Sequence, residues 1–386
     1  MDLTNYVAPA RVLLDNEVQS SNDSIRILPL PLTNFIHTLY VKVKATNGAT
    51  SARNLDISDV VDKIEVVANA SDVIFSLTAQ EIKRWCLWDT GYNLSQVRNE
   101  RPNAVQEAVF PIRFGRADFD PNFYLDAKKL ASLELKVYYS PTIGATAFAT
   151  GTVTIGVFGI ISVGAAPGQY MGTISTKTVR AFTSAASGDE PTLLPKGNLL
   201  HSAMVYVYEA GVEPAANISR IKFDLNSDQV QLFNIAWADL NDINKHDNWV
   251  CHSETIFALL ADTNTLITDV ERIIHINLQE QFAADATGDE LYTRRPTTIA
   301  GDTITVEAME IDVTAGSETI DADATARNTI AKIDGEGLSH AVVLDFSKAG
   351  DSTLLNTSAF DQVRLTLTQG NAGADVRIST KEIRNL

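Results

Sequence analysis

Cysteine is nearly absent from the sequence, and so are long hydrophobic runs. The 386 residues include two cysteines, Cys86 and Cys251, which cannot build a disulfide framework and indicate folding in a reducing cytoplasm. No apolar run reaches the ~18–20 residues that a membrane-spanning helix requires. The amino terminus lacks the basic start and apolar stretch of a secretion signal. Residues 152–163 come closest to an apolar run, but they are β-branched and interrupted by glycine, so they predict a buried strand.

Basic residues are also scarce. The chain has 31 Lys and Arg against 48 Asp and Glu, a formal net charge of −17. A surface this acidic repels phosphate backbones, so we expect no direct, sequence-specific binding of nucleic acid. The excess is uneven, because residues 285–340 carry 12 acidic and 4 basic residues, a net of −8. Nearly half of the excess lies in this one segment, which has no counterpart in the first half of the chain.

Common catalytic motifs are missing. The sequence has no G-x-S-x-G, no H-E-x-x-H and no phosphate-binding Walker loop. The six histidines are scattered at positions 37, 201, 246, 252, 275 and 340. His275 alternates with two isoleucines, so we expect it to face solvent. The many carboxylates do not indicate a glycosidase, because the separation of a catalytic pair is a three-dimensional property. We therefore predict that the protein is not an enzyme, with no catalytic residue and no cofactor site.

One short segment contains residues of the type that bind zinc. His246, Cys251 and His252 lie within seven residues of each other. Structural zinc needs four ligands, usually in paired short spacings, and a fourth would have to come from a distant residue such as Cys86. A helix end or loop with Trp249 packed inward is the favoured interpretation, so no metal site is predicted.

Acidic and basic clusters elsewhere are also better explained without a ligand. Residues 318–323 and 334–336 could bind Ca²⁺, but the EF-hand spacing is absent, so solvated loops are favoured. The Arg294-Arg295 pair could bind a carboxylate or phosphate, yet it more simply offsets the neighbouring Asp289 and Glu290.

Most of the chain shows the period-two alternation of half-buried strands. The clearest examples, separated by turns rich in Gly, Asn, Asp and Pro, are residues 38–44, 133–139, 204–208, 274–278 and 363–368. Helical signals are few. Thr78 with Glu81 three residues later is a capping box, which predicts a helix over 78–88, and residues 236–243 are its equivalent in the second half. Short helices or turns are expected at 126–131 and 356–360.

The two halves of the chain repeat one pattern. Residues 110–139 align with 342–369, so that Phe114 matches Phe346, Leu125 matches Leu355, and Leu133, Leu135 and Val137 match Val363, Leu365 and Leu367. Residues 64–82 align with 221–240 with one inserted residue, which places Ile64, Val66, Asn69, Val73 and Phe75 on Ile221, Phe223, Asn226, Val230 and Leu232. Both pairs occur in the same order, and a unit of this length indicates two related domains in tandem.

These patterns predict an all-β chain of two tandem antiparallel jelly-roll sandwiches, each with a short flanking helix. A chain of 386 residues also exceeds the size of a single growing core. We place an N-terminal arm at 1–24, the first jelly roll at 25–163, a linker at 164–190 and the second jelly roll at 191–386, with an acidic loop insertion at about 285–340. An immunoglobulin-like sandwich fits the strands less well, since such a domain needs only ~100 residues.

The pattern of residues 62–74, the short helix at 78–82, and the Leu125-Asp126 turn into the strand at 133–137 resemble the double jelly-roll major capsid proteins. These coat proteins build tailless icosahedral viruses such as tectiviruses and corticoviruses. The resemblance covers about 25–160 and, more loosely, 195–386.

The resemblance implies a structural role in the virion, after synthesis in the host cytoplasm. Three copies would form a homotrimer with a pseudo-sixfold outline, and trimers would tile an icosahedral shell. Implied partners are neighbouring capsomers, penton or minor capsid proteins and an internal membrane. The segment 285–340 would be an external tower or loop, with 303–313 forming a small hairpin strand.

Two other functions fit an all-β tandem protein. A carbohydrate-binding or glycan-cleaving protein would use exposed aromatics for stacking on sugar rings. The four tryptophans, Trp85, Trp88, Trp237 and Trp249, cluster near the two expected helices, where packing of a helix on a sheet is the commoner use. A phage spike or fibre would show longer β-repeats or collagen-like tracts, which are not found.

Overall fold

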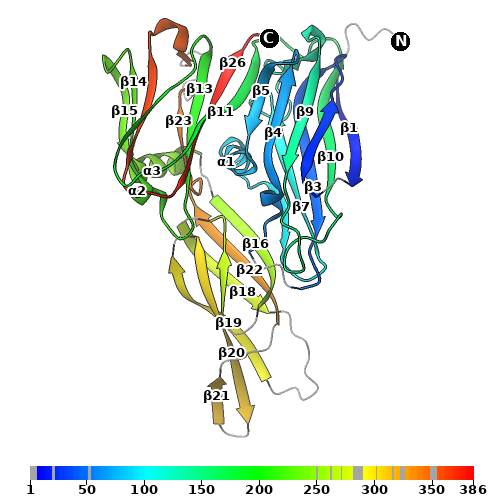
Figure 1. Ribbon diagram of the computed structural model, residues 1–386, viewed down its shortest axis with the longest axis vertical. Helices are drawn as coiled ribbons and strands as arrows, with labels where there is room; N and C mark the ends of the chain where they lie inside the picture. Colours follow the sequence, from blue (N-terminus) through cyan, green and yellow to red (C-terminus); the bar gives the residue numbers. More distant parts are fainter. Residues whose placement is uncertain are drawn as a thin grey trace.

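The computed structural model describes most of the chain. The described residues are 7–19, 22–50, 54–248, 251–260, 263–270, 272–280, 290–300, 302–314, 317–321, 327–347 and 354–386. Two β-domains stand side by side at one end of an elongated molecule, and a narrower third body extends from between them (Figure 1). Within the described residues, no helix has the length and apolar character needed to cross a membrane.

The first domain is a sandwich of two sheets with four main strands each. One sheet has the order β1 (Val7–Gln19), β10 (Thr154–Gly164), β3 (Phe35–Thr46) and β7 (Val105–Arg113). The other has the order β2 (Ser24–Pro29), β9 (Leu133–Tyr139), β4 (Val61–Ala68) and β5 (Asp72–Leu77). Apart from the β4–β5 hairpin, strands adjacent in these two sheets are far apart in sequence, which is the connectivity of a jelly roll. The alternating residues of β3 and β9 turn their apolar faces into a buried core.

The second domain repeats this arrangement strand for strand. Its first sheet has the order β11 (Thr173–Thr183), β26 (Asp375–Arg384), β13 (Leu199–Tyr208) and β23 (Ala341–Asp345). Its second sheet has the order β12 (Gly188–Leu193), β25 (Val363–Gln369), β14 (Ile218–Leu225) and β15 (Val230–Ala236). A separate core around Phe223, Leu365 and Trp237 fills the space between them. The chain is therefore a double jelly roll, as the alternation and the internal repeat predict.

The third body, which we call the tower, is inserted between the helix and the following strand of the second jelly roll. Its strands are β16 (Cys251–Leu260), β17 (Thr263–Ile267), β18 (Arg272–Glu280), β19 (Glu290–Ala300), β20 (Thr303–Thr314), β21 (Ser317–Asp321) and β22 (Arg327–Glu336). They form two sheets around a small core that includes Ile256, Ile304 and Ile333. The tower lies at the end of the molecule opposite the two termini (Figure 1).

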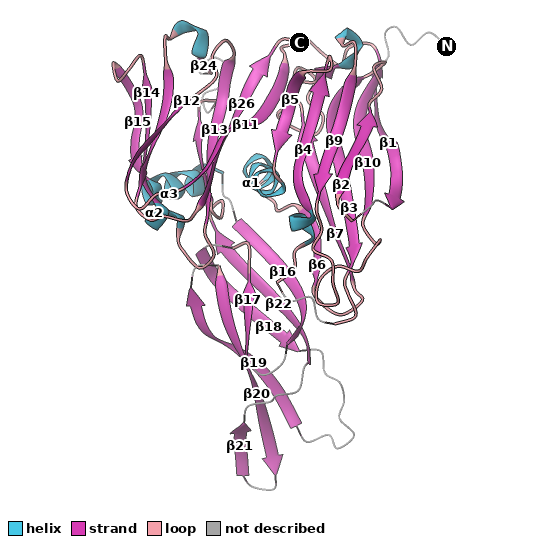
Figure 2. Ribbon diagram, viewed as in Figure 1, coloured by secondary structure: helices cyan, strands magenta, loops and turns pink. Residues whose placement is uncertain are grey.

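Helices are few and lie beside the sheets (Figure 2). Helix α1 (Ala79–Thr90) begins with the expected capping box between Thr78 and Glu81 and ends at Gly91, whose φ of 71° terminates the helix. Helix α3 (Trp237–Asn248) occupies the same position after β15. The shorter elements are η1 (Ile57–Val60), β6 (Ser95–Asn99), β8 (Leu125–Asp126), η2 (Ala127–Lys129), α2 (Pro214–Asn217), β24 (Leu355–Asn356) and η4 (Thr357–Ala359).

Hydrogen bonds repeat at the matched positions of the two jelly rolls. The backbone N–H of Phe114 donates to the carbonyl of His37, and that of Phe346 donates to the carbonyl of His201. Asn69 and Asn226 both have a φ of 51° in the hairpin turns after β4 and β14. Their side-chain oxygens accept from the backbone N–H groups of Ala131 and Asp361, respectively, at 2.8 Å each. The two halves therefore repeat the same fold.

One part of the sequence alignment is out of register. Phe75 lies opposite Val66 in its hairpin, whereas Phe233 lies opposite Phe223 in the second hairpin. Phe75 is thus equivalent to Phe233 and not to Leu232, and Val73 is equivalent to Gln231 and not to Val230. The inserted residue lies in the turn that follows Asn226, which the sequence alignment had placed later. A shift of one residue exchanges the two faces of a strand, so Leu232 is exposed while Phe233 packs on the core.

Two segments expected to lack regular structure contain strands. The expected arm, 1–24, includes β1, and the expected linker, 164–190, includes all of β11 and the start of β12. β1 thus lies where no strand was expected, and β11 is longer than the short strand considered for residues 178–182. In β1 the cause is visible, since exposed and half-buried residues follow each other irregularly around its bulges. Pairing along β10 and β26 makes the two segments strands despite their weak pattern.

The insertion is larger than the acidic segment 285–340. It runs from β16 to β22, and the alternating strand at 274–278 belongs to its sheet as β18. β22, near the end of that segment, is the strand that joins β16 to β18. The expected strand at 303–313 is present as β20. Residues 285–340 are therefore part of a folded body with a core of its own.

The equivalent turns allow a test of the duplication. We expect Asn69→Ala and Asn226→Ala each to lower the free energy of unfolding by about 1–2 kcal/mol, because alanine is strained at positive φ and the turn loses an acceptor. Asn→Gly at either site keeps the backbone conformation and should cost less. Urea unfolding of the four variants measures the difference. A similar loss for Ala and Gly would contradict the role of the positive φ.

Candidate functional site at the joint of the three cores

Charged side chains gather where the first jelly roll, the second jelly roll and the tower meet. We call this group of six the junction cluster: Asp56, Lys83, Arg84, Arg98, Glu254 and Asp269. Asp56 caps η1, Lys83 and Arg84 lie on α1, Arg98 lies on β6, Glu254 lies on β16, and Asp269 lies between β17 and β18. Within the described residues, every ion pair between the tower and the first jelly roll belongs to this cluster. Each of these pairs joins elements that are distant in the sequence.

Lys83 stands at the centre of the cluster. Its Nζ lies 2.7 Å from Oδ2 of Asp56 and 2.6 Å from Oδ2 of Asp269, and its side chain is 4% exposed. Burial opposes ionisation of all three groups, but the ion pairs outweigh it. They hold the pKa of Lys83 above its usual value and the pKa values of both aspartates below theirs. The lysine therefore remains a cation between two carboxylates.

Arg98 forms a second set of ion pairs. It contacts Glu100 at 2.7 Å and Glu254 at 2.8 Å, and its own side chain is buried. Beside these pairs the strands themselves join, because β16 runs parallel to β6 with Ile256 opposite Arg98. The N–H of Glu100 also donates to the carbonyl of Phe257 at 2.7 Å. The tower is inserted in the second jelly roll, but these backbone and side-chain contacts attach it to the first.

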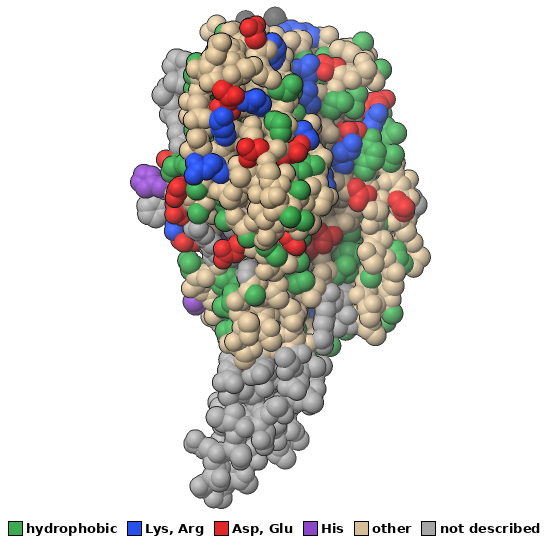
Figure 3. Space-filling view, turned by 60° about the vertical axis from the view of Figure 1, so that its left-hand side comes forward, with side chains coloured by type: hydrophobic (Ala, Val, Ile, Leu, Met, Phe, Trp, Pro, Cys, Tyr) green, Lys and Arg blue, Asp and Glu red, His purple; other side chains and the backbone are tan. Residues whose placement is uncertain are grey.

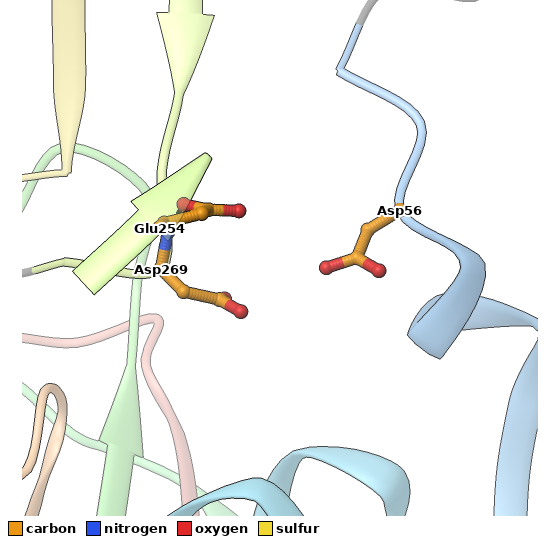
Figure 4. Close-up of side chains that lie close together, drawn as sticks. All are labelled: Asp56, Glu254 and Asp269. Atoms are coloured by element: carbon orange, nitrogen blue, oxygen red, sulfur yellow. Dashed lines mark hydrogen bonds between the residues drawn. The ribbon is translucent and has the colours of Figure 1, made fainter. Parts of the chain in front are cut away.

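Three carboxylates of the cluster have the proximity of a metal site. Oxygens of Asp56, Glu254 and Asp269 lie within 4.8 Å of one another, and Figure 4 shows them pointing toward a shared space. The ammonium of Lys83 bonds to two of them, and the guanidinium of Arg98 bonds to the third. Protein cations thus already balance these carboxylates. The arrangement is that of a buried ion-pair network.

A polar cavity of about 360 Å³ opens beside the cluster. Its walls include Asp59, Tyr206, Tyr208 and Arg377, so both jelly rolls contribute to it. Burial and the nearby Asp56 carboxylate raise the pKa of Asp59 to about 6. Tyr208 donates to Asp302 of the tower at 3.2 Å, which ties the second jelly roll to the same joint.

Two buried histidines complete the joint. His252 on β16 has Nδ1 2.7 Å from Oγ of Ser339, and His340 packs edge-on against the Tyr208 ring at 5.1 Å. Burial, and then the positive charge of Arg84, lower the pKa of both imidazoles to about 3. Both rings are therefore neutral at physiological pH.

The residues considered as zinc ligands are not brought together. His246 is 90% exposed on α3, while His252 is buried at the joint and Cys86 is buried in α1. Trp249 and the side chain of Cys251 lie outside the described residues. In the acidic segments, Asp334 and Glu336 bond to His275 and Lys245. Residues 322–323 and the side chains of Arg294 and Arg295 also lie outside the described residues.

The remaining candidates are placed as follows. His275 is exposed, as its alternation predicts. Trp85, Trp88 and Trp237 are 3%, 7% and 1% exposed, so they pack against the sheets and offer no sugar-stacking surface. On the face of Figure 3, Lys and Arg side chains stand among Asp and Glu over the coloured part of the molecule. On β14 and β25 these charges pair, as Lys222 and Arg364 do with Asp228.

Little in the sequence pointed to the junction cluster. Lys83 and Arg84 stand between Ile82 and Trp85 in an otherwise apolar part of α1, which is unusual for residues that are rarely buried without a partner. That signal points to a buried cation. It does not identify Asp269 or Glu254, which lie more than 150 residues away.

The double jelly roll and its tower define a class of structure that occurs among solved proteins. No family model and no curated protein matches the sequence. The chain is similar in structure to the MCP of STIV, Sulfolobus Turreted Icosahedral Virus, with 10% identity, a TM-score of 0.56 and coverage of 97% of both chains. It is also similar to the major capsid protein P2 from bacteriophage PM2, with 10% identity, a TM-score of 0.51 and coverage of 98% of both chains. VP54 of PBCV-1 is similar at 9% identity and a TM-score of 0.54, over 98% of this chain and 95% of that chain. These likenesses establish the double jelly-roll fold over the whole chain.

Removal of the central cation should weaken the joint strongly. Lys83→Met leaves Asp56 and Asp269 facing each other without the ammonium, and breaking a buried pair in this way costs about 3–5 kcal/mol. Lys63→Met is the matched control, because Lys63 is 40% exposed in its pair with Glu65 and such pairs contribute at most about 1 kcal/mol. Urea unfolding compares the two variants. An equal loss of unfolding free energy in the two variants would mean that the buried network stabilises the fold no more than a surface ion pair does.

The buried histidines should make the protein less stable as the pH falls. Below pH 6.5 the unfolded chain binds protons at His252 and His340 that the folded chain binds only near pH 3. Each histidine therefore lowers the free energy of unfolding by about 1.4 kcal/mol for every pH unit below 6.5 in this window. Above pH 6.5 both states are neutral at these histidines, and the full stability is present. Asp59 acts in the opposite sense between pH 3.8 and about 6, because its folded-state pKa is raised.

The slope of stability against pH is the measurement. We expect His340→Asn to reduce the slope between pH 6.5 and 5 by about 1.4 kcal/mol per unit. An unchanged slope in His340→Asn would show that His340 protonates equally in both states.

Proposed function

We propose that this protein is the major capsid protein of a tailless icosahedral virus. One observation carries the proposal: the fold agrees with capsid proteins over 97–98% of this chain and 95–98% of theirs, including both jelly rolls. A partial match could reflect one widespread β-sandwich, whereas two jelly rolls in the same order make a far more specific architecture. The role is structural: the chain buries its own edges against other copies.

The internal duplication supports a closed trimer. Each chain supplies two jelly rolls of the same design, so three chains place six similar lobes around one axis. A trimer of this kind has a nearly hexagonal outline, which can tile a surface. The edges β1 and β15 end their sheets within the described chain, and open edges of this length are normally covered.

The position of the tower supports an orientation in the shell. Both termini lie at one end of the jelly rolls and the tower lies at the other (Figure 1). We assign the tower to the virion exterior and the opposite end to the interior, next to an internal membrane or the genome. Penton and minor capsid proteins would then contact the outer flanks of the trimer.

A non-enzymatic role fits the joint. The buried carboxylates are balanced by Lys83 and Arg98 and leave no acid poised for catalysis within the described cluster. No observation favours the carbohydrate-binding alternative, since the described tryptophans are buried.

Oligomeric state and assembly are the tests of the capsid role. We expect light scattering of the purified protein to give a mass close to three times 42.0 kDa, and electron microscopy of concentrated protein or particles to show hexagonal capsomers. A strictly monomeric protein at high concentration, with no capsomers or shells, would contradict the proposed function.

A further inference from the structure

We propose that residues 337–340, the connection by which the chain returns from the tower to the second jelly roll, form an acid-released hinge. In mild acid the tower separates from the first jelly roll, while the three apolar cores stay folded. This change of shape takes place within one chain. It therefore goes beyond the proposed function and holds whether or not the chain builds a capsid.

The backbone of the hinge is strained. Gly337, Ser339 and His340 have φ angles of 84°, 47° and 60°. Glycine adopts such angles readily, whereas the Cβ atoms of Ser339 and His340 make them unfavourable. Two neighbouring residues persist in this conformation only when their surroundings hold them there. Loss of those contacts would let the hinge relax, so the strain favours opening.

Different bodies hold the two neighbouring residues of the hinge. The carbonyl of His340 accepts the backbone N–H of Val207 at 2.8 Å, and its ring packs against Tyr208, so both contacts are with β13 of the second jelly roll. Oγ of Ser339, in contrast, lies 2.7 Å from Nδ1 of His252 on β16 of the tower. The step from Ser339 to His340 is therefore the point where the contacts change from the tower to the second jelly roll.

The hinge is buried, although connections between elements normally run over the surface. Leu338, Ser339 and His340 are 0%, 1% and 1% exposed. Leu338 belongs to the apolar cluster that contains Trp85 of α1 and Tyr206 of β13, so it packs with elements of both jelly rolls. The strained conformation is therefore maintained by the closed joint around it.

Charged groups from all three bodies lie around the hinge and its two imidazoles. They are Lys83 and Arg84 on α1, Arg98 on β6, Asp56 and Asp59 at η1, Glu254 on β16, Asp269 after β17, Asp302 before β20, and Lys245 on α3 with its partner Glu336 on β22. Arg84 has the largest effect after burial itself, and together they lower the pKa of both imidazoles to about 3. The ion pair of Arg84 with Asp269 is long, at 3.5 Å, so that carboxylate balances the guanidinium only weakly.

Protonation of His252 or His340 opposes the closed joint. An imidazolium at either position would be a further cation close to Arg84, in a site from which water is largely excluded. When the joint opens, both rings reach water, and they take up a proton near the ordinary pKa of 6.5. Acid therefore favours the open form.

The two histidines outweigh Asp59, which acts in the opposite sense. Each histidine raises the ratio of open to closed molecules up to tenfold for every pH unit below 6.5. Asp59 has a pKa of about 6 in the closed joint against an ordinary value of 3.8, so its protonation favours the closed form by up to tenfold per unit in that range. Lowering the pH from 6.5 to 4.5 should therefore raise the open-to-closed ratio about 300-fold.

The layout of the cores allows the joint to open without unfolding. The tower encloses a core of its own, separate from those of the two jelly rolls. Its strand contact with the first jelly roll is short, since β16 pairs with β6 only through Ile256 opposite Arg98 and Phe257 opposite Asn99. Opening breaks this contact and the ion pairs of the junction cluster, but it removes no strand from a core. Such local opening needs less free energy than global unfolding.

Hydrogen exchange of the Glu100 amide tests the hinge, because this N–H donates to the carbonyl of Phe257 across the joint. The protection factor divides out the pH dependence of the intrinsic exchange rate. We expect it to fall about 300-fold at Glu100 between pH 6.5 and 4.5. The amides of β9, β25 and β22, one strand from each body, should stay protected because the cores remain folded.

A disulfide across the joint gives the matched control. Val97 and Thr255 each lie one residue before the pair Arg98–Ile256. The two Cα atoms in Val97→Cys/Thr255→Cys should therefore be about 4.8 Å apart, within the range that a disulfide bridges. The oxidised form should keep Glu100 protected at pH 4.5, and reduction of the same protein should restore the acid-induced loss. The native Cys86 and Cys251 are retained.

The histidines are tested by substitution with asparagine, which takes up no proton and tolerates the positive φ of residue 340. In His252→Asn/His340→Asn the acid-induced loss of protection at Glu100 should disappear. The single His340→Asn variant should retain only about a threefold loss, because Asp59 then opposes one remaining histidine. Urea unfolding at pH 7 verifies that each variant folds.

Three results would overturn the hinge. They are a Glu100 amide that stays protected down to pH 4.5, a simultaneous loss of protection in all three bodies, and a full 300-fold loss in the histidine variants. None of them bears on the mass measured by light scattering, so the hinge and the capsid role are tested separately.

Discussion

The parallel pairing of β5 with β11 is the contact on which the arrangement of the molecule depends. A sheet edge left open exposes unpaired backbone groups, and each jelly roll has such edges. Pairing one edge from each domain converts two sandwiches into one continuous structure, so that the second sheet of the first jelly roll continues into the first sheet of the second. Helix α1 covers the corner that this pairing creates, and its capping-box residue Glu81 contacts β11 directly. The strands that still end their sheets in the described jelly rolls include β1 and β15 on the two flanks.

The buried ions of the junction cluster specify geometry more than they add stability. Burying Lys83 with two aspartates costs desolvation that the ion pairs only partly regain, and a well-packed apolar cluster would be as stable. An apolar cluster, however, would tolerate sliding of one body against another. Ion pairs at 2.6–2.8 Å tolerate little displacement, so the tower keeps one orientation relative to both jelly rolls. That rigidity would suit the proposed capsid role, because small errors of orientation accumulate over many copies of a tiled subunit.

The tower shows how a repeated fold can accommodate a large folded insertion. It is inserted at one connection of the second jelly roll, has a core of its own, and is held by contacts with the first jelly roll through β6. The insertion therefore does not disturb the repeated sheets. Since its strands lie at the end opposite the termini, it can vary in size without changing the edges at which copies would meet.

The sequence by itself determined the fold class, the duplication, the helix at 78–88 and its cap, because these follow from alternation, spacing and local hydrogen bonds within a few residues. Phe114 and Phe346, or Asn69 and Asn226, could be matched by pattern alone. The strand character of β1 and β11, the one-residue offset of Phe233 and the full extent of the tower depended on long-range pairing, which local patterns do not encode. The junction cluster was decided only by the tertiary structure, since Lys83 meets Asp56 and Asp269 from separate elements, and a charge acquires its role from the partners that folding brings within 3 Å of it.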